Sequence, residues 1–106
     1  MIEEMTPREF AARTQDGASQ VLLDVREEWE LGLAKVDMAL HIPMGSVPER
    51  LDELERDREI VVMCRSGGRS AQVANYLQQQ GFRHVWNLAG GIIAWSEQVD
   101  SSISPY

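Results

Sequence analysis

Apolar positions along the chain follow two alternating patterns, and together these predict an α/β fold with a mainly parallel sheet. Short runs of consecutive apolar and β-branched residues are typical of buried strands, and the clearest run covers residues 59–63. The stretches between the runs carry apolar residues three and four positions apart, which is typical of amphipathic helices. We expect strands at residues 21–25, 39–42, 59–63 and 84–88, and helices at 6–17, within 26–35, at 46–54, 70–80 and 92–99.

Two of these helices begin with a sequence that is typical of a capping box. Thr6 precedes Pro7, and Glu9 follows three positions after the threonine. The segment Ser46-Val47-Pro48-Glu49 has the same form and predicts a second capped helix. Gly17 and Gly81 lie where helices are expected to end, because glycine adopts the left-handed conformation that commonly follows a last helical turn.

The length and composition predict a single domain over residues 1–106, with a polar and loose tail at 100–106. The chain has 106 residues, and 43% of them are hydrophobic, which is enough for a core that needs no disulfide or metal. It contains one cysteine, so it cannot form an intramolecular disulfide, and this fits a reducing compartment. We expect a monomer, since a sheet with both faces covered needs no partner to fold.

The charge balance argues against nucleic-acid and membrane binding. Ten basic and seventeen acidic residues leave a formal net charge of −7, which repels phosphate backbones and anionic lipids. The N-terminus lacks the basic start and the apolar core of a signal peptide. No apolar run reaches the roughly 18 residues that a membrane span needs. These features predict a cytoplasmic protein.

The single cysteine opens a segment, CRSGGRS at residues 64–70, that breaks this acidic pattern. Cys64 directly follows the strand at 59–63, and a helix is expected a few residues later. Ligands bind at such strand ends in open α/β sheets. Gly67 and Gly68 allow the loop to turn several backbone N–H groups toward one point, and the following helix adds the positive end of its dipole. Such a loop stabilises an anion, which favours a nucleophilic Cys64 thiolate.

Each residue of the loop also has an ordinary structural explanation. A lone cysteine after a strand is often a small buried core residue, and Ser70 is also placed to cap the next helix. Arg65, Arg69 and Ser66 have the alternative of facing solvent. We nevertheless interpret residues 65–70 as the binding loop for an anionic substrate, because two arginines next to one thiol are exceptional in this acidic chain.

We expect no metal site and no cofactor. The two histidines, His41 and His84, have no ligand-like spacing to each other or to Cys64. Neither histidine is placed as a general base, and a thiolate that is stabilised by its loop does not need one.

Three segments in the same order resemble the single-domain rhodaneses, which are sulfurtransferases. They are LLDVR at residues 22–26 followed by Glu30 and Gly32, the loop CRSGGRS at 64–70, and NLAGGIIAW at 87–95. The resemblance covers nearly the whole chain, and it implies a five-stranded parallel sheet with helices on both faces. One segment departs from the family pattern. Residues 32–39 are longer and lack the histidine and the second glycine that the family carries there.

The spacing in the loop bears on the choice between chemistries within this superfamily. Related phosphatases and arsenate reductases place an arginine six positions after the cysteine, in a loop wide enough for a tetrahedral anion. Here Arg69 stands five positions after Cys64, and Ser70 occupies the sixth position. The shorter loop resembles that of the sulfurtransferases, so sulfur transfer is favoured over phosphate hydrolysis or arsenate reduction.

The resemblance therefore implies a sulfurtransferase that works through a persulfide on Cys64. We expect a small anionic donor such as thiosulfate, bound by residues 65–70, and cyanide, a thiol or a protein cysteine as acceptor. The alternative is a persulfide carrier in a sulfur relay, with weak activity toward free thiosulfate. The sequence does not separate these two functions, because the same loop serves both.

Overall fold

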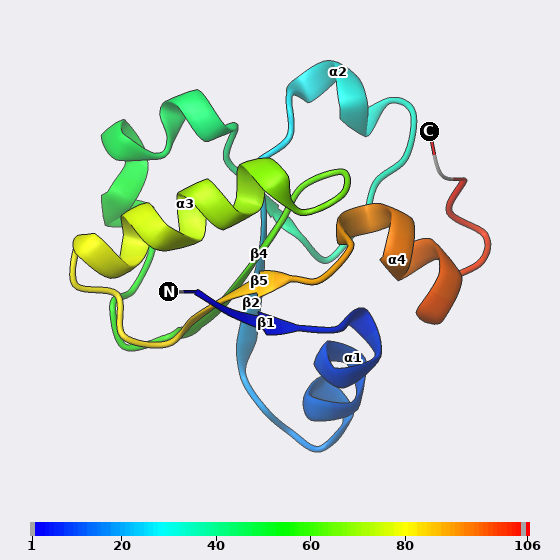
Figure 1. Cartoon of the computed structure of the whole chain (residues 1–106), viewed down its shortest axis with the longest axis horizontal. Coiled ribbons are helices and arrows are strands. Elements are labelled where there is room, and N and C mark those ends of the chain that lie inside the picture. The colour runs from blue at the N-terminus through cyan, green and yellow to red at the C-terminus, as the bar shows by residue number, and fades with distance from the viewer. Residues whose placement is uncertain (1, 105) are drawn as a thin grey trace.

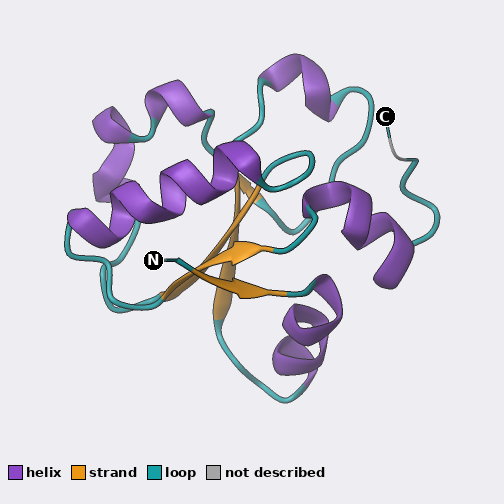
Figure 2. Ribbon diagram, viewed as in Figure 1, coloured by secondary structure: helices purple, strands orange, loops and turns teal. Residues whose placement is uncertain are grey.

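Five parallel strands form the centre of the chain, and helices cover both faces of the sheet (Figures 1 and 2). The computed structural model describes residues 2–104 and 106. The strands are β1 (Glu3–Met5), β2 (Gln20–Asp24), β3 (Leu40–His41), β4 (Glu59–Met63) and β5 (Val85–Leu88), and their spatial order is β1-β5-β4-β2-β3. The helices are α1 (Pro7–Gln15), α2 (Glu28–Leu31), α3 (Gly68–Gln79) and α4 (Gly91–Gln98). Every described strand pair is parallel, which confirms the predicted fold class.

Alternate residues of the central strand β4 enter two separate hydrophobic clusters. Ile60 and Val62 join the cluster beneath α3, whereas Val61 and Met63 join the cluster beneath α1 and α4. This period of two follows from the pleat of a strand, and burial on both faces explains why the sequence shows a continuous apolar run. Cys64 continues the alternation on the α3 side, so its side chain faces the first turn of that helix.

The first predicted capping box is confirmed at the start of α1. The Thr6 hydroxyl accepts a hydrogen bond from the Glu9 amide at 3.0 Å, and the Glu9 carboxylate accepts one from the Thr6 amide at 2.8 Å. Gly17 and Gly81 follow the ends of α1 and α3 with φ angles of +96° and +91°, as expected for glycines beyond a helix C-terminus.

The second predicted capping box was wrong. Residues 44–53 form two 3₁₀ segments, η1 (Met44–Ser46) and η2 (Pro48–Glu53), and Ser46 makes no capping bond. Ser46 lies inside η1, and Val47 already has helical angles (φ −58°, ψ −46°), so Ser46 lacks the extended backbone of an N-cap residue. The segment instead uses tighter bonds between residues three apart. Val47 and Leu54 are still buried in the α3-side cluster, as their spacing predicted.

Two terminal features differ from the expectation. Strand β1 was not predicted, because three residues with only Met5 buried give no clear apolar run. The tail at 100–106 was expected to be loose, but it makes contacts with the rest of the chain. The Ser96 hydroxyl donates to the Ile103 carbonyl at 2.6 Å, and Tyr106 lies against the cysteine loop.

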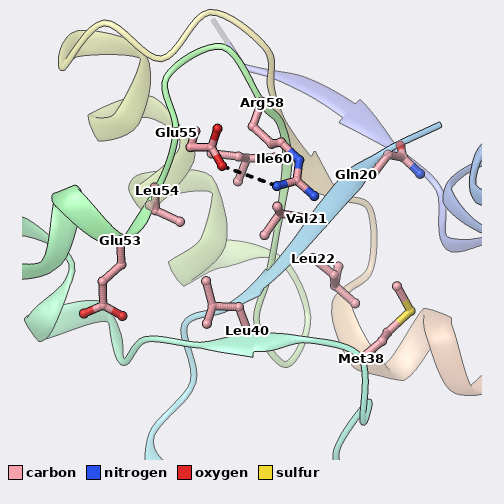
Figure 3. Close-up of a pocket in the computed structure, with 10 residues that line it drawn as sticks. All are labelled: Gln20, Val21, Leu22, Met38, Leu40, Glu53, Leu54, Glu55, Arg58 and Ile60. Atoms are coloured by element: carbon pink, nitrogen blue, oxygen red, sulfur yellow. Dashed lines mark ion pairs between the residues drawn. The ribbon is translucent and has the colours of Figure 1, made fainter.

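A cavity of about 290 Å³ lies beside the N-terminal halves of β2 and β4 (Figure 3). Its lining residues are Gln20, Val21, Leu22, Met38, Leu40, Glu53, Leu54, Glu55, Arg58 and Ile60. Arg58 and Glu55 form an exposed ion pair at its rim, with 3.6 Å between nitrogen and oxygen. Since none of the lining residues belongs to the segment 64–70, this cavity is separate from the predicted site.

Candidate active site

Cys64 lies immediately after β4, and the segment 64–67 turns the chain into α3 (Figure 1). Its thiol is free and buried, with 1% of the residue exposed. The turn depends on Gly67, whose φ of +120° is strained for any residue with a side chain. Because Gly67 is also the N-cap of α3, the free N–H groups of the first helical turn lie close to the sulfur.

Several hydrogen-bond donors converge on the sulfur of Cys64. The Gly67 amide lies 3.1 Å from Sγ, and the Ser70 hydroxyl lies 3.2 Å from it. Burial raises the pKa of the Cys64 thiol, but hydrogen bonds from the Ser70 hydroxyl and from the backbone of Ser70, Gly67 and Ser66 outweigh that effect. The net pKa lies below the ordinary value of a cysteine. The loop therefore favours the thiolate, as its glycines and the following helix predicted; the share of the Ser70 hydroxyl was not predicted.

The start of α4 supports the cysteine loop from behind. The Ile92 amide donates to the Cys64 carbonyl at 2.9 Å, and the Ile93 amide donates to the Arg65 carbonyl at 3.3 Å. Gly91 makes this approach possible, since a Cβ at that position would lie only 2.4 Å from the Arg65 carbonyl oxygen. The two glycine-containing junctions thus pack against each other through backbone atoms.

Arg69 forms a two-pronged ion pair with Glu30 of α2. Its terminal nitrogens lie 2.7 and 2.9 Å from the two carboxylate oxygens, and the Glu30 side chain is almost completely buried. The hydrogen bond from Arg69 lowers the pKa of Glu30 to about 2, so the carboxylate stays charged at neutral pH. The structure brings the predicted substrate-binding Arg69 to the site, but two of its five N–H donors are already paired with Glu30. In the sequence, Glu30 stood out only as part of the motif at residues 22–32, and its pairing with Arg69 was not predicted.

The other two arginines near the site contact the tail and the end of β2. Arg65 hydrogen-bonds the Tyr106 carbonyl, and its guanidinium lies over the Tyr106 ring at 5.2 Å from the centroid. Arg26 is fully buried and pairs with Asp24, two residues earlier, at 2.8 Å. Asp24 and Arg26 therefore form a buried structural ion pair at the end of β2.

Asn87 is a buried polar residue whose place at the site was not predicted from the sequence. It lies on β5 with 2% of its surface exposed, and its amide contacts β1, the cysteine loop and α3. Its Nδ2 donates to the Gly67 carbonyl and to a Glu4 carboxylate oxygen, both at 3.1 Å. Its Oδ1 accepts the Ser70 hydroxyl at 2.5 Å. A polar residue within the apolar run of a strand was the available signal, since a buried amide requires partners.

The loop and fold define a class of protein in which a buried thiol is surrounded by donors at the carboxyl end of a parallel sheet. The model of the family described as Rhodanese-like domain matches residues 6–98. The chain therefore belongs to the rhodanese-like domain family, as its motifs indicated. Within the described residues, no helix is long and apolar enough to cross a membrane, and no group of three or more histidine, cysteine or acidic side chains is arranged to hold a metal ion.

Two curated relatives that align along nearly their whole length are named as sulfurtransferases. A sulfurtransferase of Allochromatium vinosum is 38% identical over 105 residues, with 99% of this chain and 98% of the relative covered. A proposed sulfurtransferase of Bacillus subtilis is 39% identical over 94 residues, covering 89% of this chain and 90% of the relative. A second Bacillus subtilis protein, proposed to be a sulfur carrier, is 34% identical over 99 residues, which are 93% of this chain and 54% of that protein.

Solved structures agree with the fold. The crystal structure of a rhodanese-like domain protein from Staphylococcus aureus superposes with a TM-score of 0.85, at 26% identity and with 99% of both chains covered. Family and named relatives together support sulfurtransferase activity at the general level.

Proposed function

We propose that this chain moves sulfane sulfur from thiosulfate, or a related anionic donor, to cyanide or a thiol through a persulfide on Cys64. The observation that carries the proposal is the convergence of the Gly67 amide and the Ser70 hydroxyl on a buried sulfur, at 3.1 and 3.2 Å. Donors in that arrangement stabilise a negative sulfur before and after the reaction.

The proposed reaction has two steps. After each step the Cys64 side chain carries one negative charge on sulfur, first as a persulfide and then as a thiolate. The Cys64 thiolate attacks the outer sulfur of thiosulfate, the bond between the two donor sulfurs breaks, and sulfite leaves with the electron pair. The product is a cysteine persulfide anion whose terminal sulfur is held by backbone N–H groups of residues 65–70. Cyanide or a thiolate then attacks the terminal sulfur, and Cys64 leaves as the thiolate with which the cycle began.

Arg65 and Arg69 are proposed to attract the donor and to stabilise the departing sulfite. Both lie at the loop, but Glu30 balances the charge of Arg69, and Arg65 contacts Tyr106. The guanidinium of Arg69 retains donors beyond the two that bind Glu30, because it carries five N–H groups. Its contribution is therefore expected to be one charge-assisted contact and not a strong free positive field.

Intact mass spectrometry tests the covalent step directly. The protein is incubated with thiosulfate, the excess is removed, and the mass is measured before and after addition of cyanide. We expect a gain of about 32 Da, one sulfur atom, which cyanide removes and which Cys64→Ser does not show. A protein that gains no sulfur from thiosulfate would contradict the proposed donor.

The second candidate function is that of a persulfide carrier, which accepts sulfur from a partner protein and passes it on. The pairing of Arg69 with Glu30 favours this candidate, because it leaves less free positive charge for a small dianion. Saturation separates the two functions. An enzyme for thiosulfate saturates at modest donor concentration, whereas a carrier shows a rate that rises linearly and remains low.

Hydrolysis of a phosphate ester is disfavoured by the same loop. Arg69 stands five positions after Cys64, and the hydroxyl of Ser70 faces the sulfur from the sixth position. Turnover of an aryl phosphate that disappears in Cys64→Ser would support this function instead. The cytoplasmic location and the monomeric state remain predictions from the sequence.

A further inference from the structure

The Ser70 hydroxyl faces two acceptors but has only one proton to give. The Asn87 Oδ1 lies 2.5 Å from Ser70 Oγ, and the Cys64 Sγ lies 3.2 Å from it. Ser70, Asn87 and Cys64 are all buried, so solvent does not supply a hydrogen bond to whichever acceptor the Ser70 hydroxyl leaves. Where the proton points therefore depends on which acceptor needs it more.

The orientation of the Asn87 amide follows from its other partners. Its Nδ2 contacts the carbonyl of Gly67 and the carboxylate of Glu4, and both of these groups only accept hydrogen bonds. The NH₂ group must face them, which leaves Oδ1 facing Ser70 as a pure acceptor. Asn87 is thus held by β1 and by the loop in the orientation that attracts the Ser70 proton.

The protonation state of Cys64 changes this competition. A protonated thiol can donate to the Ser70 oxygen while the Ser70 hydroxyl donates its own hydrogen bond to Asn87 Oδ1. Each of these polar groups then has a partner. A thiolate has no proton and requires a donor. The Ser70 hydroxyl must then rotate so that it donates to the sulfur and no longer to Asn87 Oδ1. The buried Oδ1 then loses its donor, and an unsatisfied buried acceptor is unfavourable.

We propose that Asn87 is a positioning residue that holds the Ser70 proton away from Cys64 while the thiol is protonated and so opposes its ionisation. Asn87 limits how strongly the loop stabilises the free thiolate, which also keeps the sulfur nucleophilic, because nucleophilicity falls as the thiol pKa falls. The inference concerns only the ionisation of Cys64, so its test does not depend on the proposed sulfur donor.

Asn87→Leu removes the acceptor and keeps the number and branching of the side-chain heavy atoms. The Gly67 carbonyl keeps a donor in this variant, because the Ala71 amide also contacts it at 3.1 Å. With Asn87 gone, the Ser70 proton is free to serve the sulfur. We expect the pKa of Cys64 to fall by about 0.5 to 1, a threefold to tenfold rise in thiolate at a pH below the pKa.

The pKa is measured from the pH dependence of iodoacetamide alkylation, which reports on Cys64 alone because the chain has one cysteine. The measurement is made on the wild type, Asn87→Leu, Ser70→Ala and the double variant. The charged groups that border the site stay the same in all four proteins. They are Glu4, Asp24, Arg26, Glu30, Arg65 and Arg69, with His41 and Tyr106 as further titratable groups.

The double variant decides the result. If Asn87 acts through Ser70, Asn87→Leu lowers the pKa in the Ser70 background and leaves it nearly unchanged in the Ser70→Ala background. An equal shift in both backgrounds, or a rise of the pKa in Asn87→Leu, would overturn the proposal and assign Asn87 only the support of Gly67.

Val85→Ala is the matched control. Val85 lies on the same strand as Asn87, and its side chain packs in the hydrophobic cluster beneath α3. As an apolar side chain it cannot form a hydrogen bond with the Ser70 hydroxyl. It is expected to lower stability without changing the pKa of Cys64. If Asn87→Leu does not fold, Asn87→Ala removes the same oxygen with a smaller side chain, and the same comparison with Ser70→Ala applies.

Discussion

The chain contains two junctions of one design, in which a strand passes through a glycine turn into a helix, yet they use their backbone groups differently. At the first junction, between β4 and α3, the Gly67 amide faces the sulfur of Cys64. At the second, between β5 and α4, the amides of Ile92 and Ile93 donate to the carbonyls of Cys64 and Arg65. The first junction directs a backbone donor toward the sulfur of Cys64, whereas the backbone donors of the second junction bind carbonyl groups of the first and hold it in place.

This difference shows that a glycine turn before a helix is not by itself a functional site. Gly67 and Gly90 both have positive φ angles and both precede a helix of eight or more residues. The two junctions differ because a cysteine directly follows β4, whereas Ala89 directly follows β5. The neighbouring junction contributes rigidity, which an anion-binding loop needs if its donors are to stay aligned.

The largest effect is expected from removing the sulfur of the first junction. Cys64→Ser is expected to abolish sulfur transfer and leave the fold intact, because serine fits the same space without forming a persulfide. Thiosulfate:cyanide transfer and thermal unfolding are the two measurements. Retained transfer in this variant would contradict the assigned role of Cys64.

Adding one methyl group to the second junction is expected to have the next largest effect. Gly91→Ala would place its Cβ 2.4 Å from a backbone oxygen and impose a side chain on a φ of +60°. We expect a loss of about 2 to 4 kcal/mol in the free energy of unfolding.

Gly68→Ala is the matched control for that change, since nothing lies within 4 Å of its Cβ and its backbone is helical. It is expected to stay within about 0.5 kcal/mol of the wild type. Equal losses in the two variants, measured by denaturant unfolding, would mean that the close approach of the junctions does not matter.

Removing the arginine of the first junction tests its proposed role in donor binding. Arg69→Ala is expected to reduce kcat/KM for thiosulfate by about 10- to 100-fold, which corresponds to one charge-assisted contact of about 1.5 to 3 kcal/mol. Arg50→Ala removes the same charge from an exposed pair with Glu53 and serves as the control. An unchanged rate in Arg69→Ala would mean that this arginine serves only Glu30.

The smallest effect concerns the acid stability of the Glu30–Arg69 pair. The pKa of Glu30 is lowered from 4.5 to about 2, so its contribution to stability is complete above about pH 4.5 and is lost as the pH falls toward 2. In Glu30→Gln this part of the pH dependence should disappear. Between pH 4.5 and 2, the free energy of unfolding of the wild type should fall by about 1 to 3 kcal/mol more than that of Glu30→Gln, as measured by urea unfolding. Solvent limits this value, because Arg69 is partly exposed.

Glu53→Gln provides the comparison for that titration, because it removes the carboxylate of an exposed pair. Its acid profile should follow that of the wild type closely. If Glu30→Gln also follows the wild-type profile, the buried position of Glu30 would add nothing to the pair.

The sequence by itself determined the strands at the centre of the sheet, the helix that follows the cysteine and the polarity of the loop. These features depend on neighbours in the chain: the apolar run at residues 59–63 requires burial on both faces, and glycines directly after a thiol require a turn lined with N–H groups. Three segments in the correct order were enough to indicate the family. The capping box at 46–49 was mispredicted because Ser46 already belongs to a preceding 3₁₀ turn that begins at Met44.

Only the tertiary structure decided how the polar groups around the sulfur are paired. Glu30 lies 39 positions from Arg69, and Glu4 lies 83 positions from Asn87, so no local pattern reveals either contact. Gly91 approaches Arg65 only because β4 and β5 are adjacent in the sheet, which brings the two junctions together. Local sequence specifies which groups are available, but the strand order specifies which of them meet. For that reason the place of Cys64 directly after a buried strand was predictable here, whereas the partners of Arg69 and Ser70 were not.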